Sequence, residues 1–476
     1  MKYTKRKIST ICCIGAGYVG GPTMAVLADK CEDIKVYVVD KNKERINAWN
    51  SHDLNNLPVY EPKLSAVISR ARDRNLFFSE NVRKYIGLAD MIFLSVNTPT
   101  KVKGIGSGQA SDLKWIEACA RDVAKWAKGH TIIVEKSTIP VRTAETIKII
   151  LESDQADKNK KTFSVLSNPE FLAEGSAIND LENPDRVLIG GENEDSINSL
   201  CEIYERWVDK GRIIKTNLWS SELSKLIANA FLAQRVSSIN SISALCEKTG
   251  ADIIQVSDAI GSDTRIGSRF LEAGPGFGGS CFKKDILNLV YLCNHFGLPE
   301  VANYWNSVIS INNWQQKRIS QTIVNKLFGT LTDKKIVILG FSFKADTNDT
   351  RESPAIYIAK DLLEEGANLV IHDPKVDQKQ IEFELGIGMS CTSIEKNIVL
   401  SEKKRQNNWQ YANSIENAIE NADAVVIITN WIEYKNLNWK NLYKKMRKPA
   451  WLFDTRSLIN INDIKNIGIN IWQIGT

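Results

Sequence analysis

The chain has 476 residues, of which 43% are hydrophobic and 25% charged, and 61 Lys and Arg against 56 Asp and Glu give a net charge of +5. This balance is typical of a soluble globular protein, the length predicts roughly three domains at about 150 residues each, and no run approaches the ~20 apolar residues of a membrane span. The weak positive charge favours a small anionic ligand over nucleic acid, and the N-terminal segment lacks the cleavage region of a signal peptide, so we expect a cytoplasmic protein with neither membrane nor nucleic acid as a partner.

The nine cysteines are scattered and form no CxxC pair. This pattern indicates reduced thiols rather than a disulfide framework or a zinc site, so no metal is expected. The four histidines lie outside any glycine-rich or carboxylate-bearing motif, which makes a histidine base an unlikely basis for catalysis.

The first part of the chain, residues 1–215, alternates short apolar strands with helical segments. The expected strands are Ser9–Ile14, Val36–Val39, Met91–Val96, Thr131–Lys136 and Val187–Ile189. Alternation of this kind predicts a parallel sheet covered by helices on both faces.

A glycine motif of the form GxGxxG directly follows the first strand, with glycines at Gly15, Gly17 and Gly20. Glycines at this spacing permit a tight turn and close approach of the backbone to a pyrophosphate. Asp40 ends the second strand about 20 residues further on, where a carboxylate accepts hydrogen bonds from a ribose diol and repels a 2′-phosphate. NAD is therefore favoured, while Lys41 and Arg45 keep NADP as an alternative.

Two further segments of this part carry candidate polar groups. Asn168 is expected to cap a helix that begins at Pro169, so that Glu170 and Glu174 share one face as acid/base candidates or as first-turn carboxylates. The strand Thr131–Lys136 ends in a turn at Ser137 and Thr138, near the position where a nicotinamide should lie.

The second part opens with a stretch from Asn217 to Thr249 that contains neither Gly nor Pro and ends at Gly250. At about 1.5 Å per residue this is a helix on the order of 45 Å long, which predicts a connection between domains or a subunit interface. Lys225 and Asn229 lie four residues apart on it and should project to one side.

The loop before Cys281 holds four glycines in six residues, Gly274 to Gly279. Glycines contribute no side chain to a core, so this composition favours a loop whose backbone contacts a ligand. Ser280 lies near the expected N-cap of the next helix, which puts Cys281 in the first turn. There the helix dipole and Lys283 or Lys284 favour the thiolate. Asp285 lies four residues on, and a thiol beside NAD suggests oxidation through a thiohemiacetal and a thioester.

The third part again alternates strands and helices, with strands expected at Lys334–Gly340, Asn368–His372, Ala424–Thr429 and Trp451–Asp454. The first of these strands continues into Phe341 and Lys344 without a second and third glycine, so Lys344 fits a mononucleotide phosphate better than a dinucleotide. The predicted fold class is α/β. Two Rossmann-like, doubly wound parallel-sheet domains, residues 1–215 and 331–476, are joined by a central helical domain with one long helix, residues 216–330.

Several long runs, in order and spacing, resemble the UDP-glucose/GDP-mannose dehydrogenase family, in particular its animal-type UDP-glucose 6-dehydrogenase members. These runs are GAGYVGGPT, SVNTPT, EKSTIPVR, SNPEFLAEG, NPDRVLIGG, SSELSKLIANAFLAQR, GFGGSC and GFSFKADTNDTRES. The resemblance implies a cytoplasmic oxidoreductase that converts UDP-glucose, two NAD and water into UDP-glucuronate and two NADH.

The resemblance also implies roles for individual residues. Cys281 matches the nucleophile, Lys225 and Asp285 the pair for alkoxide stabilisation and water activation, Glu170 an acid/base carboxylate, and Thr138 a neighbour of the catalytic water, with Asn229 completing the catalytic set. The implied NAD contacts are Gly15, Ala16, Gly17, Tyr18, Val19, Gly20, Asp40, Arg45, Ser95, Val96, Asn97, Thr98, Pro99, Ser137, Thr138, Glu174 and Arg351. The implied sugar-nucleotide contacts are Glu170, Phe171, Leu172, Ala173, Glu174, Lys225, Asn229, Arg265, Phe270, Glu272, Phe277, Gly278, Phe343, Lys344 and Arg456.

In such enzymes the equivalent of Arg265 comes from a neighbouring subunit, which implies a homodimer or a dimer-based hexamer. Glu272 departs from the family, because animal relatives usually carry Lys there. Three alternatives stay open: a sister enzyme that uses GDP-mannose or UDP-N-acetylmannosamine, a two-electron hydroxy-acid dehydrogenase, and a non-catalytic NAD-binding protein.

Overall fold

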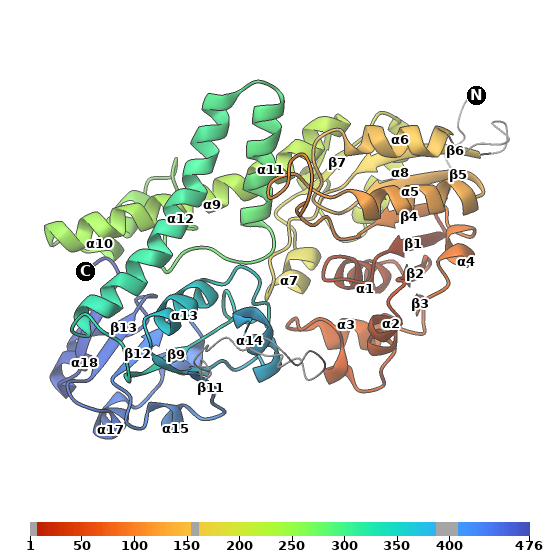
Figure 1. Ribbon diagram of the computed structural model, residues 1–476. Helices are drawn as coiled ribbons and strands as arrows, with labels where there is room; N and C mark the ends of the chain where they lie inside the picture. The colour runs from red at the N-terminus through yellow and green to blue at the C-terminus, as the bar shows by residue number, and fades with distance from the viewer. Residues whose placement is uncertain (1–6, 154–160, 387–407) are drawn as a thin grey trace, which may run out of the picture. The chain divides into compact units, whose positions relative to one another are not determined.

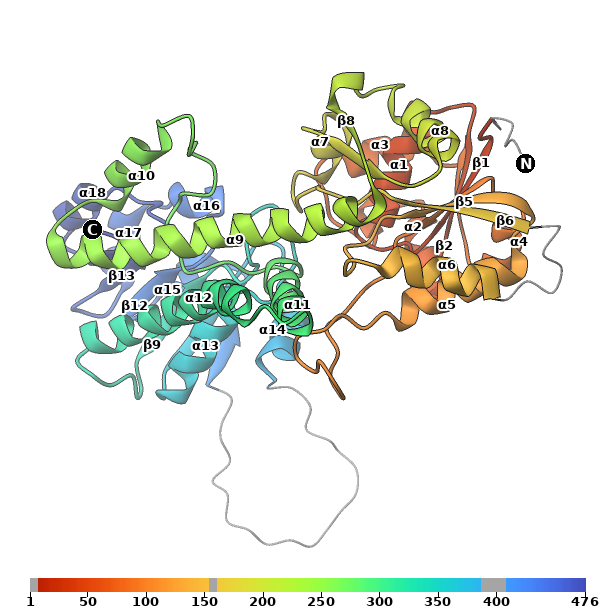
Figure 2. The ribbon, with the colours of Figure 1, turned by 90° about the horizontal axis from the view of Figure 1, so that it is seen from above.

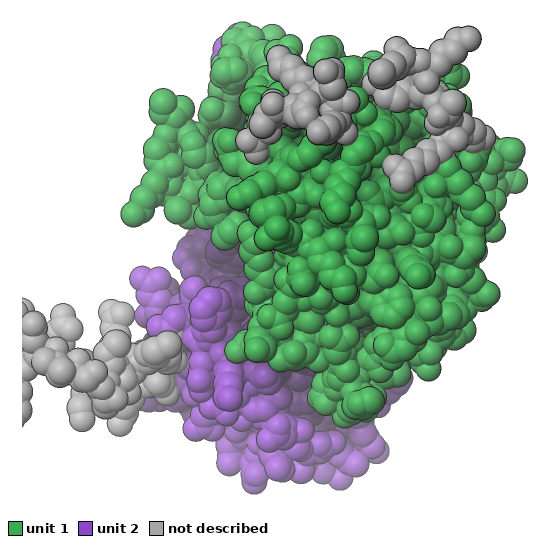
Figure 3. All heavy atoms as spheres, turned by 90° about the vertical axis from the view of Figure 1, so that its right-hand side faces the viewer, with its two compact units in different colours: residues 1–229, 287–298 green, residues 230–286, 299–476 purple. Residues whose placement is uncertain are grey.

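The computed structural model describes residues 7–153, 161–386 and 408–476. They form two compact units, coloured separately in Figure 3. Unit 1 comprises residues 1–229 and 287–298, and unit 2 comprises residues 230–286 and 299–476.

The core of unit 1 is an eight-stranded sheet in the order β3-β2-β1-β4-β5-β6-β7-β8. Its first six strands have the order of a dinucleotide-binding Rossmann sheet and are parallel, whereas β6 and β7 pair antiparallel. The strands are β1 (Thr10–Ile14), β2 (Lys35–Val39), β3 (Leu76–Ser79), β4 (Met91–Leu94), β5 (Gly129–Glu135), β6 (Lys161–Ser167), β7 (Val187–Gly190) and β8 (Ile213–Thr216).

Helices cover both faces of this sheet (Figure 1). Alternate residues of β1 separate the two faces, since Ile11 and Cys13 pack into one apolar cluster and Cys12 and Ile14 into the other. The first face carries α1 (Gly20–Lys30), α2 (Lys43–Trp49), α3 (Leu64–Ala71), α7 (Ala177–Glu182) and α8 (Glu194–Tyr204). The second carries α4 (Val82–Ile86), α5 (Lys114–Trp126) and α6 (Thr143–Ser153).

Unit 2 contains a six-stranded parallel sheet in the order β11-β10-β9-β12-β13-β14. Its strands are β9 (Lys335–Leu339), β10 (Asn368–His372), β11 (Trp409–Tyr411), β12 (Ala424–Ile427), β13 (Trp451–Asp454) and β14 (Asn470–Gln473). One face packs on α12 (Pro299–Lys326), α13 (Pro354–Glu364) and α14 (Gln378–Leu385). The other packs on α15 (Ile415–Ile419), α16 (Ile432–Lys435), α17 (Trp439–Lys445) and α18 (Ile461–Ile467).

The helix α9 (Leu218–Thr249) is unbroken over 32 residues, as Figure 2 shows. It ends at Gly250, whose φ of 78° is the left-handed conformation that commonly closes a helix. Two shorter helices follow, α10 (Ile253–Gly261) and α11 (Phe282–His295). Both α9 and α11 begin in one unit and end in the other. Within the described ranges, no helix is both long and apolar enough to cross a membrane. The predicted fold class is confirmed, with two doubly wound sheets and a helical region that contains one long helix.

Candidate functional site

The three glycines of the turn after β1 meet three different surroundings. Gly15 has a φ of 110°, and a Cβ added there would lie 2.3 Å from the Ser95 carbonyl oxygen. A Cβ added at Gly20 would lie 2.0 Å from the carbonyl oxygen of Gly15, so this glycine allows α1 to pack against the turn. A Cβ at Gly17 would meet no atom of the described chain within 4 Å. The turn is therefore closed by Gly15 and Gly20 and open at Gly17, the side from which a pyrophosphate can approach the backbone.

Asp40 lies at the end of β2 beside this turn. Its Oδ2 accepts hydrogen bonds from the Ala16 amide at 3.0 Å and from Arg45 Nη1 at 3.1 Å, and its Oδ1 accepts one from the Asn42 amide at 2.9 Å. The carboxylate keeps 15% of its side chain exposed, which leaves room for the two hydroxyls of a ribose. Lys41 forms its ion pair with Asp122 of α5 at 3.2 Å instead. These residues fit an adenosine diphosphate of the NAD type.

The open side of the turn gives a prediction that separates binding from folding. Gly17→Ala is expected to fold like wild type and to weaken NAD binding by about tenfold or more, a loss of about 1.4 kcal/mol, because its methyl group enters the space of the pyrophosphate. Gly20→Ala, whose methyl group meets backbone, is expected to lower the free energy of unfolding by about 1–3 kcal/mol. Calorimetric titration with NAD and denaturant unfolding measure the two effects. Wild-type NAD affinity in Gly17→Ala would show that the dinucleotide does not use this turn.

The loops that follow β4 and β5 are bonded to each other. Ser137 Oγ donates to the Val96 carbonyl at 2.6 Å, and Thr98 Oγ1 donates to the Thr138 carbonyl at 2.7 Å. Both loops leave the carboxyl ends of central strands, which is where ligands bind in open α/β sheets. The predicted cofactor residues from Ser95 to Pro99 and at Ser137 and Thr138 therefore lie together.

A buried ion pair joins the end of β5 to the segment that follows β6. Lys136 Nζ lies 2.9 Å from Glu170 Oε2 and donates to Asn168 Oδ1 at 3.0 Å and to the Tyr204 hydroxyl at 3.1 Å. Glu170 Oε1 accepts from the amides of Phe171 and Leu172, the first at 2.8 Å. Lys136 thus joins three parts of unit 1, namely the end of β5, the segment after β6 and the end of α8.

The prediction of a helix from Pro169 is wrong. Residues 168–173 form no helix, and the next one, α7, begins at Ala177. Asn168 is 1% exposed and bonds Lys136, Tyr204 and the Leu188 carbonyl instead of capping a helix. Glu170 and Glu174 therefore do not share a helical face.

The ion pair changes the ionisation of both partners. Burial opposes the charged form of Glu170, but the Lys136 ammonium and the two backbone amides outweigh it, so the pKa of Glu170 is lowered. Burial likewise lowers the pKa of Lys136, and the charge of Glu170 together with Tyr204 raises it above its ordinary value. Glu170 is consequently held as a carboxylate.

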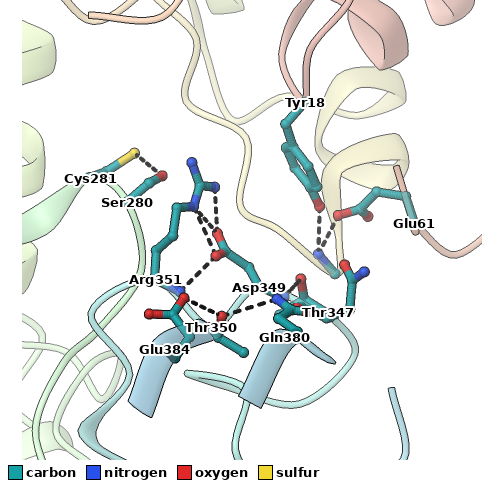
Figure 4. Close-up of polar contacts among 12 residues, drawn as sticks. Tyr18, Glu61, Ser280, Cys281, Thr347, Asp349, Thr350, Arg351, Gln380 and Glu384 are labelled. Carbon is teal, nitrogen blue, oxygen red and sulfur yellow. Dashed lines mark hydrogen bonds and ion pairs between the residues drawn. The ribbon is translucent and has the colours of Figure 1, made fainter. Parts of the chain in front are cut away.

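The turn that follows Glu174 is fixed by two side chains. The Gly175 amide donates to Glu61 Oε1 at 2.5 Å and also lies 3.3 Å from the Tyr18 hydroxyl, and the Ala177 amide donates to Glu61 Oε2 at 3.0 Å. Figure 4 shows Tyr18 and Glu61 directed at the same amide. The Tyr18 hydroxyl thereby links the segment that carries Glu174 to the glycine turn, and the buried carboxylate of Glu61 fixes the start of α7.

Lys225 and Asn229 are both buried on α9, at 7% and 5% exposure. Lys225 Nζ donates to Asn229 Oδ1 at 3.2 Å, as their spacing predicts. The Phe171 ring lies near two cations, with its centroid 5.2 Å from Lys225 Nζ and 4.0 Å from the Arg186 guanidinium. The segment after β6 therefore contacts the predicted catalytic lysine directly.

The cysteine loop, residues 274–281, belongs to unit 2. The Cys281 carbonyl accepts the first hydrogen bond of α11, from the Asp285 amide at 2.8 Å, so Cys281 itself is the N-cap and Ser280 precedes it. This moves the expected cap by one residue. The Ser280 hydroxyl lies 3.4 Å from the Cys281 sulfur (Figure 4).

The two lysines that follow Cys281 have different partners. Lys283 bonds Glu352 at 2.7 Å and the Tyr357 hydroxyl at 3.1 Å. Lys284 pairs with Asp285 at 2.6 Å. Burial lowers the pKa of Lys284, but Asp285 and then Cys281 raise it above its ordinary value. Of the two lysines, Lys284 is thus the one whose ionisation is coupled to Cys281.

The segment that follows β9 borders the cysteine loop. A Cβ added at Gly278 would lie 2.6 Å from the Glu352 carbonyl oxygen and 2.9 Å from Phe343 Cβ. Arg351 bonds Asp349 through its guanidinium (Figure 4). The Lys344 ammonium lies 5.5 Å from the centroid of the Phe343 ring.

Arg456 touches the start of the same loop, since a Cβ at Gly274 would lie 3.0 Å from its Nη1. Its Nε donates to the Ile428 carbonyl at 2.7 Å. Burial lowers the pKa of Arg456 to about 10, and Glu272 opposes this shift. Glu272 thus places a carboxylate in the electrostatic environment of a predicted substrate-binding arginine.

Arg265 and Phe270 lie in an exposed loop after α10. The side chain of Arg265 is 87% exposed and pairs with its neighbour Asp263. Arg235 of α9 anchors the loop by donating hydrogen bonds to the carbonyls of Ile266, Gly267 and Arg269 at 2.7–3.0 Å.

The turn after β9 in unit 2 resembles the glycine turn of unit 1, but the aspartate beside it has different surroundings. Gly340 has a φ of 95°, and Asp373 at the end of β10 accepts from the Phe341 amide at 2.7 Å, as Asp40 does from Ala16. However, Asp373 is 2% exposed and also accepts from Ser342, Lys375, Val376 and the Trp431 indole. Its oxygens are occupied by the protein, so this half does not offer a ribose acceptor of the Asp40 type.

Sequence reasoning missed Lys136, Tyr204 and Glu61. Lys136 directly follows a central strand, and its position at the carboxyl end of β5 is the signal that could have singled it out. No local pattern marks Tyr204 or Glu61, which act through partners more than 30 residues away. The described residues include no group of three His, Cys, Asp or Glu side chains arranged to hold a metal ion.

Comparisons with known proteins agree with this geometry. Models of the UDP-glucose/GDP-mannose dehydrogenase family match the NAD binding domain over residues 9–208, the central domain over 219–314 and the UDP binding domain over 337–461. The UDP-glucose 6-dehydrogenase of Mus musculus is 53% identical over 98% of this chain and 94% of its own length, and that of Caenorhabditis elegans is 52% identical over 99% and 96%.

A solved structure leads to the same family. The UDP-glucose dehydrogenase of the hyperthermophilic archaeon Pyrobaculum islandicum superposes with a TM-score of 0.83, at 28% identity over 98% of both chains. The chain therefore belongs to the UDP-glucose/GDP-mannose dehydrogenase family and is an NAD-dependent dehydrogenase.

Proposed function

We propose that this enzyme oxidises UDP-glucose to UDP-glucuronate, with two NAD and one water consumed and two NADH and three protons released per turnover. The observation that carries the proposal is the position of Cys281, which caps α11 at the end of a glycine-rich loop and has the Lys284–Asp285 ion pair beside it. A thiol so placed suits a reaction that must hold an aldehyde between two oxidations, because a free aldehyde is hydrated and lost.

NAD supplies the hydride acceptor, and the glycine turn, Asp40, Arg45 and the loops after β4 and β5 would hold it. The chain's own groups do the rest. Lys225, bonded to Asn229, stabilises the alkoxide formed when the sugar's C6 hydroxyl loses its proton. Loss of a hydride from C6 of this alkoxide gives the aldehyde, to which the Cys281 sulfur adds to give a thiohemiacetal. Loss of the hydroxyl proton and a second hydride from the thiohemiacetal leaves a thioester.

Water completes the reaction by attacking the thioester carbon, so that the carbon–sulfur bond breaks and the thiolate returns. Glu170, held as a carboxylate by Lys136, and Asp285 are the groups proposed to orient this water and accept its protons, with Thr138 beside it. The surrounding peptide from Phe171 to Glu174 is proposed to contact the sugar nucleotide.

We propose that the unit 2 sheet binds the uridine diphosphate. Lys344 and Arg456 supply the positive charge, Phe343 and Phe277 the apolar surface, and Gly278 a backbone that a ligand can approach. The hydrogen bonds that Asp373 already accepts from the protein support this assignment. A second dinucleotide would need a carboxylate oxygen that is available to its ribose, and the oxygens of Asp373 are occupied. The carboxylate of Glu272 partly offsets the positive charge of Arg456. We therefore expect the phosphate affinity of this enzyme to differ from that of relatives that carry Lys at this position.

A second copy of the chain is the proposed partner, as a homodimer or a dimer-based hexamer. Phe231 and Leu245 of α9 are 55% and 57% exposed, and Ile254 of α10 is 45% exposed. Exposed apolar side chains on a long helix and its neighbour favour burial against another subunit. The exposed Arg265 would then be offered across that interface to the partner's substrate.

The test is the amount of NADH formed per nucleotide sugar consumed, followed at 340 nm with UDP-glucose, GDP-mannose and UDP-N-acetylmannosamine. A ratio of two with UDP-glucose supports the four-electron route. A ratio of one contradicts it, because oxidation then ends at the aldehyde. Turnover of another sugar without turnover of UDP-glucose would assign the chain to a sister activity of the family.

A further inference from the structure

The backbone of the cysteine loop is buried but has few side chains to anchor it. Residues 274–279 are all buried, and four of the six are glycines. Gly276 and Gly279 have φ values of 115° and 82°, in the region that other residues rarely adopt. Glycine-rich segments lose much conformational entropy on ordering, and buried peptide groups need hydrogen-bond partners. Something outside the loop must therefore hold it.

Asn312 of α12 holds the middle of the loop. Its Oδ1 accepts from the Phe277 amide at 2.8 Å, and its Nδ2 donates to the Phe277 carbonyl at 3.2 Å. The side chain is 4% exposed. A Cβ added at Gly276 would lie 2.7 Å from the same Oδ1, so the loop backbone rests directly on this carboxamide.

Two other carboxamides hold the start of the loop in the same way. The Gly274 amide donates to Asn240 Oδ1 of α9 at 2.8 Å, and Gln315 Nε2 of α12 donates to the Gly274 carbonyl at 2.9 Å. Asn240 and Gln315 are fully buried. Arg318 donates to Gln315 Oε1 at 3.1 Å, which fixes the orientation of that amide.

We propose that Asn312, Asn240 and Gln315 are positioning residues for the reaction. By holding the main chain of the loop, they set the position of Cys281. Phe277 lies four residues before Cys281, and the intervening glycines cannot restore the geometry once Phe277 moves. A displacement of about 1 Å at a reacting group costs roughly a hundredfold in rate. The inference rests on the proposed function in taking Cys281 as the reacting thiol.

The experiment uses Asn312→Asp, which is nearly isosteric. Its ionised carboxylate still accepts from the Phe277 amide but repels the Phe277 carbonyl, whereas its protonated form donates to that carbonyl and restores the wild-type pair. Burial raises the pKa of such a carboxyl, so the repair falls in an accessible acidic range. Asn313→Asp is the matched control, because Asn313 is the next residue of α12 and is exposed.

Two quantities are measured from pH 5 to pH 9: kcat and KM with UDP-glucose, and the rate at which iodoacetamide alkylates Cys281 in the full-length enzyme. At pH 8 we expect Asn312→Asp to lose about 30- to 100-fold in kcat and to alkylate Cys281 at a changed rate. For both kcat and the alkylation rate, the ratio of the variant's value to that of wild type should return toward one by pH 5.5. Asn313→Asp should stay within about twofold of wild type throughout.

A kcat ratio that stays near one, or that does not change with pH, would overturn the proposal, since loss and repair of the Asn312–Phe277 pair would then leave the reacting thiol unaffected. If Asn312→Asp does not fold, Gln315→Met removes the donor to the Gly274 carbonyl without placing a carboxylate beside Arg318, and it must lower kcat and change the alkylation rate. Alkylation needs no sugar nucleotide, so a recovering alkylation rate supports the inference even where UDP-glucose is not oxidised. Recovery of alkylation without recovery of kcat in an active enzyme would contradict Cys281 as the reacting thiol.

Discussion

Cys281→Ser is expected to slow NADH formation from UDP-glucose by roughly three orders of magnitude or more at saturating substrate, about 4 kcal/mol of transition-state stabilisation. Serine is a much weaker nucleophile than cysteine, because a thiol ionises far more readily than an alcohol and its sulfur is more nucleophilic. The variant should therefore fail to hold the aldehyde for its second oxidation. Single-turnover absorbance should show no more than one NADH per enzyme, and a carbonyl reagent should trap the aldehyde.

Cys293→Ser is the matched control, since Cys293 lies on the same helix α11. It is 8% exposed, and burial raises the pKa of its thiol, so it is a structural cysteine. We expect this variant to keep activity within about twofold of wild type, because isolated changes away from the reacting groups have small effects. Retention of a tenth or more of wild-type activity by Cys281→Ser would rule out the covalent route.

The strands with continuous apolar runs were predictable from the sequence. β10 and β13 have the predicted bounds, and β1, β9 and β12 differ by one or two residues at their ends. The strands that sequence reasoning missed include β3 and β11, which lie at sheet edges and are four and three residues long. Short edge strands gain their structure from the neighbouring strand rather than from a local pattern, so a sequence window contains little of the information that forms them.

The candidate site shows the same division between local and distant causes. The Lys225–Asn229 bond follows from helix geometry alone. The prediction of a helix after Asn168 was wrong because the capping signal is local, whereas the partners that Asn168 actually bonds are distant in sequence. Lys136 is 32 residues away in the chain and Tyr204 is 36. A buried ammonium that needs an acceptor overrides the preference of Asn and Pro for a helix start.

The two glycine turns show that the motif alone does not determine whether a turn can bind a ligand. Gly15 and Gly340 both adopt positive φ after a central strand, and both turns bond an aspartate at the end of the neighbouring strand. The difference lies in the donors around that aspartate, which are few at Asp40 and many at Asp373. The Trp431 indole that occupies Asp373 is 58 residues distant in sequence. Only the folded structure shows that one turn is available to a ribose and the other is closed.

Lys136→Met is expected to lower the free energy of unfolding of unit 1 by about 3–5 kcal/mol, since it leaves the buried Glu170 carboxylate without its cation. Lys210→Met is the matched control: Lys210 is 80% exposed and pairs with Glu205 at 3.2 Å, and such surface pairs contribute about 0–1 kcal/mol. Guanidinium unfolding of both variants measures the difference. A shift in Lys136→Met no larger than in the control would show that the buried pair does not stabilise the fold.

The pH dependence of this effect has a definite sign. The pKa of Glu170 in the folded protein is lowered, so its stabilising contribution is complete above the ordinary value of about 4.3 and is lost as the pH falls through the lowered folded value. The gap between wild type and Lys136→Met should therefore be full at pH 7 and close only in strong acid. The double variant Lys136→Met/Glu170→Gln removes the uncompensated charge and should recover part of the lost stability at pH 7 but none of the activity, because the carboxylate proposed to orient the water is then absent. Recovery of both would mean that Glu170 serves the fold alone.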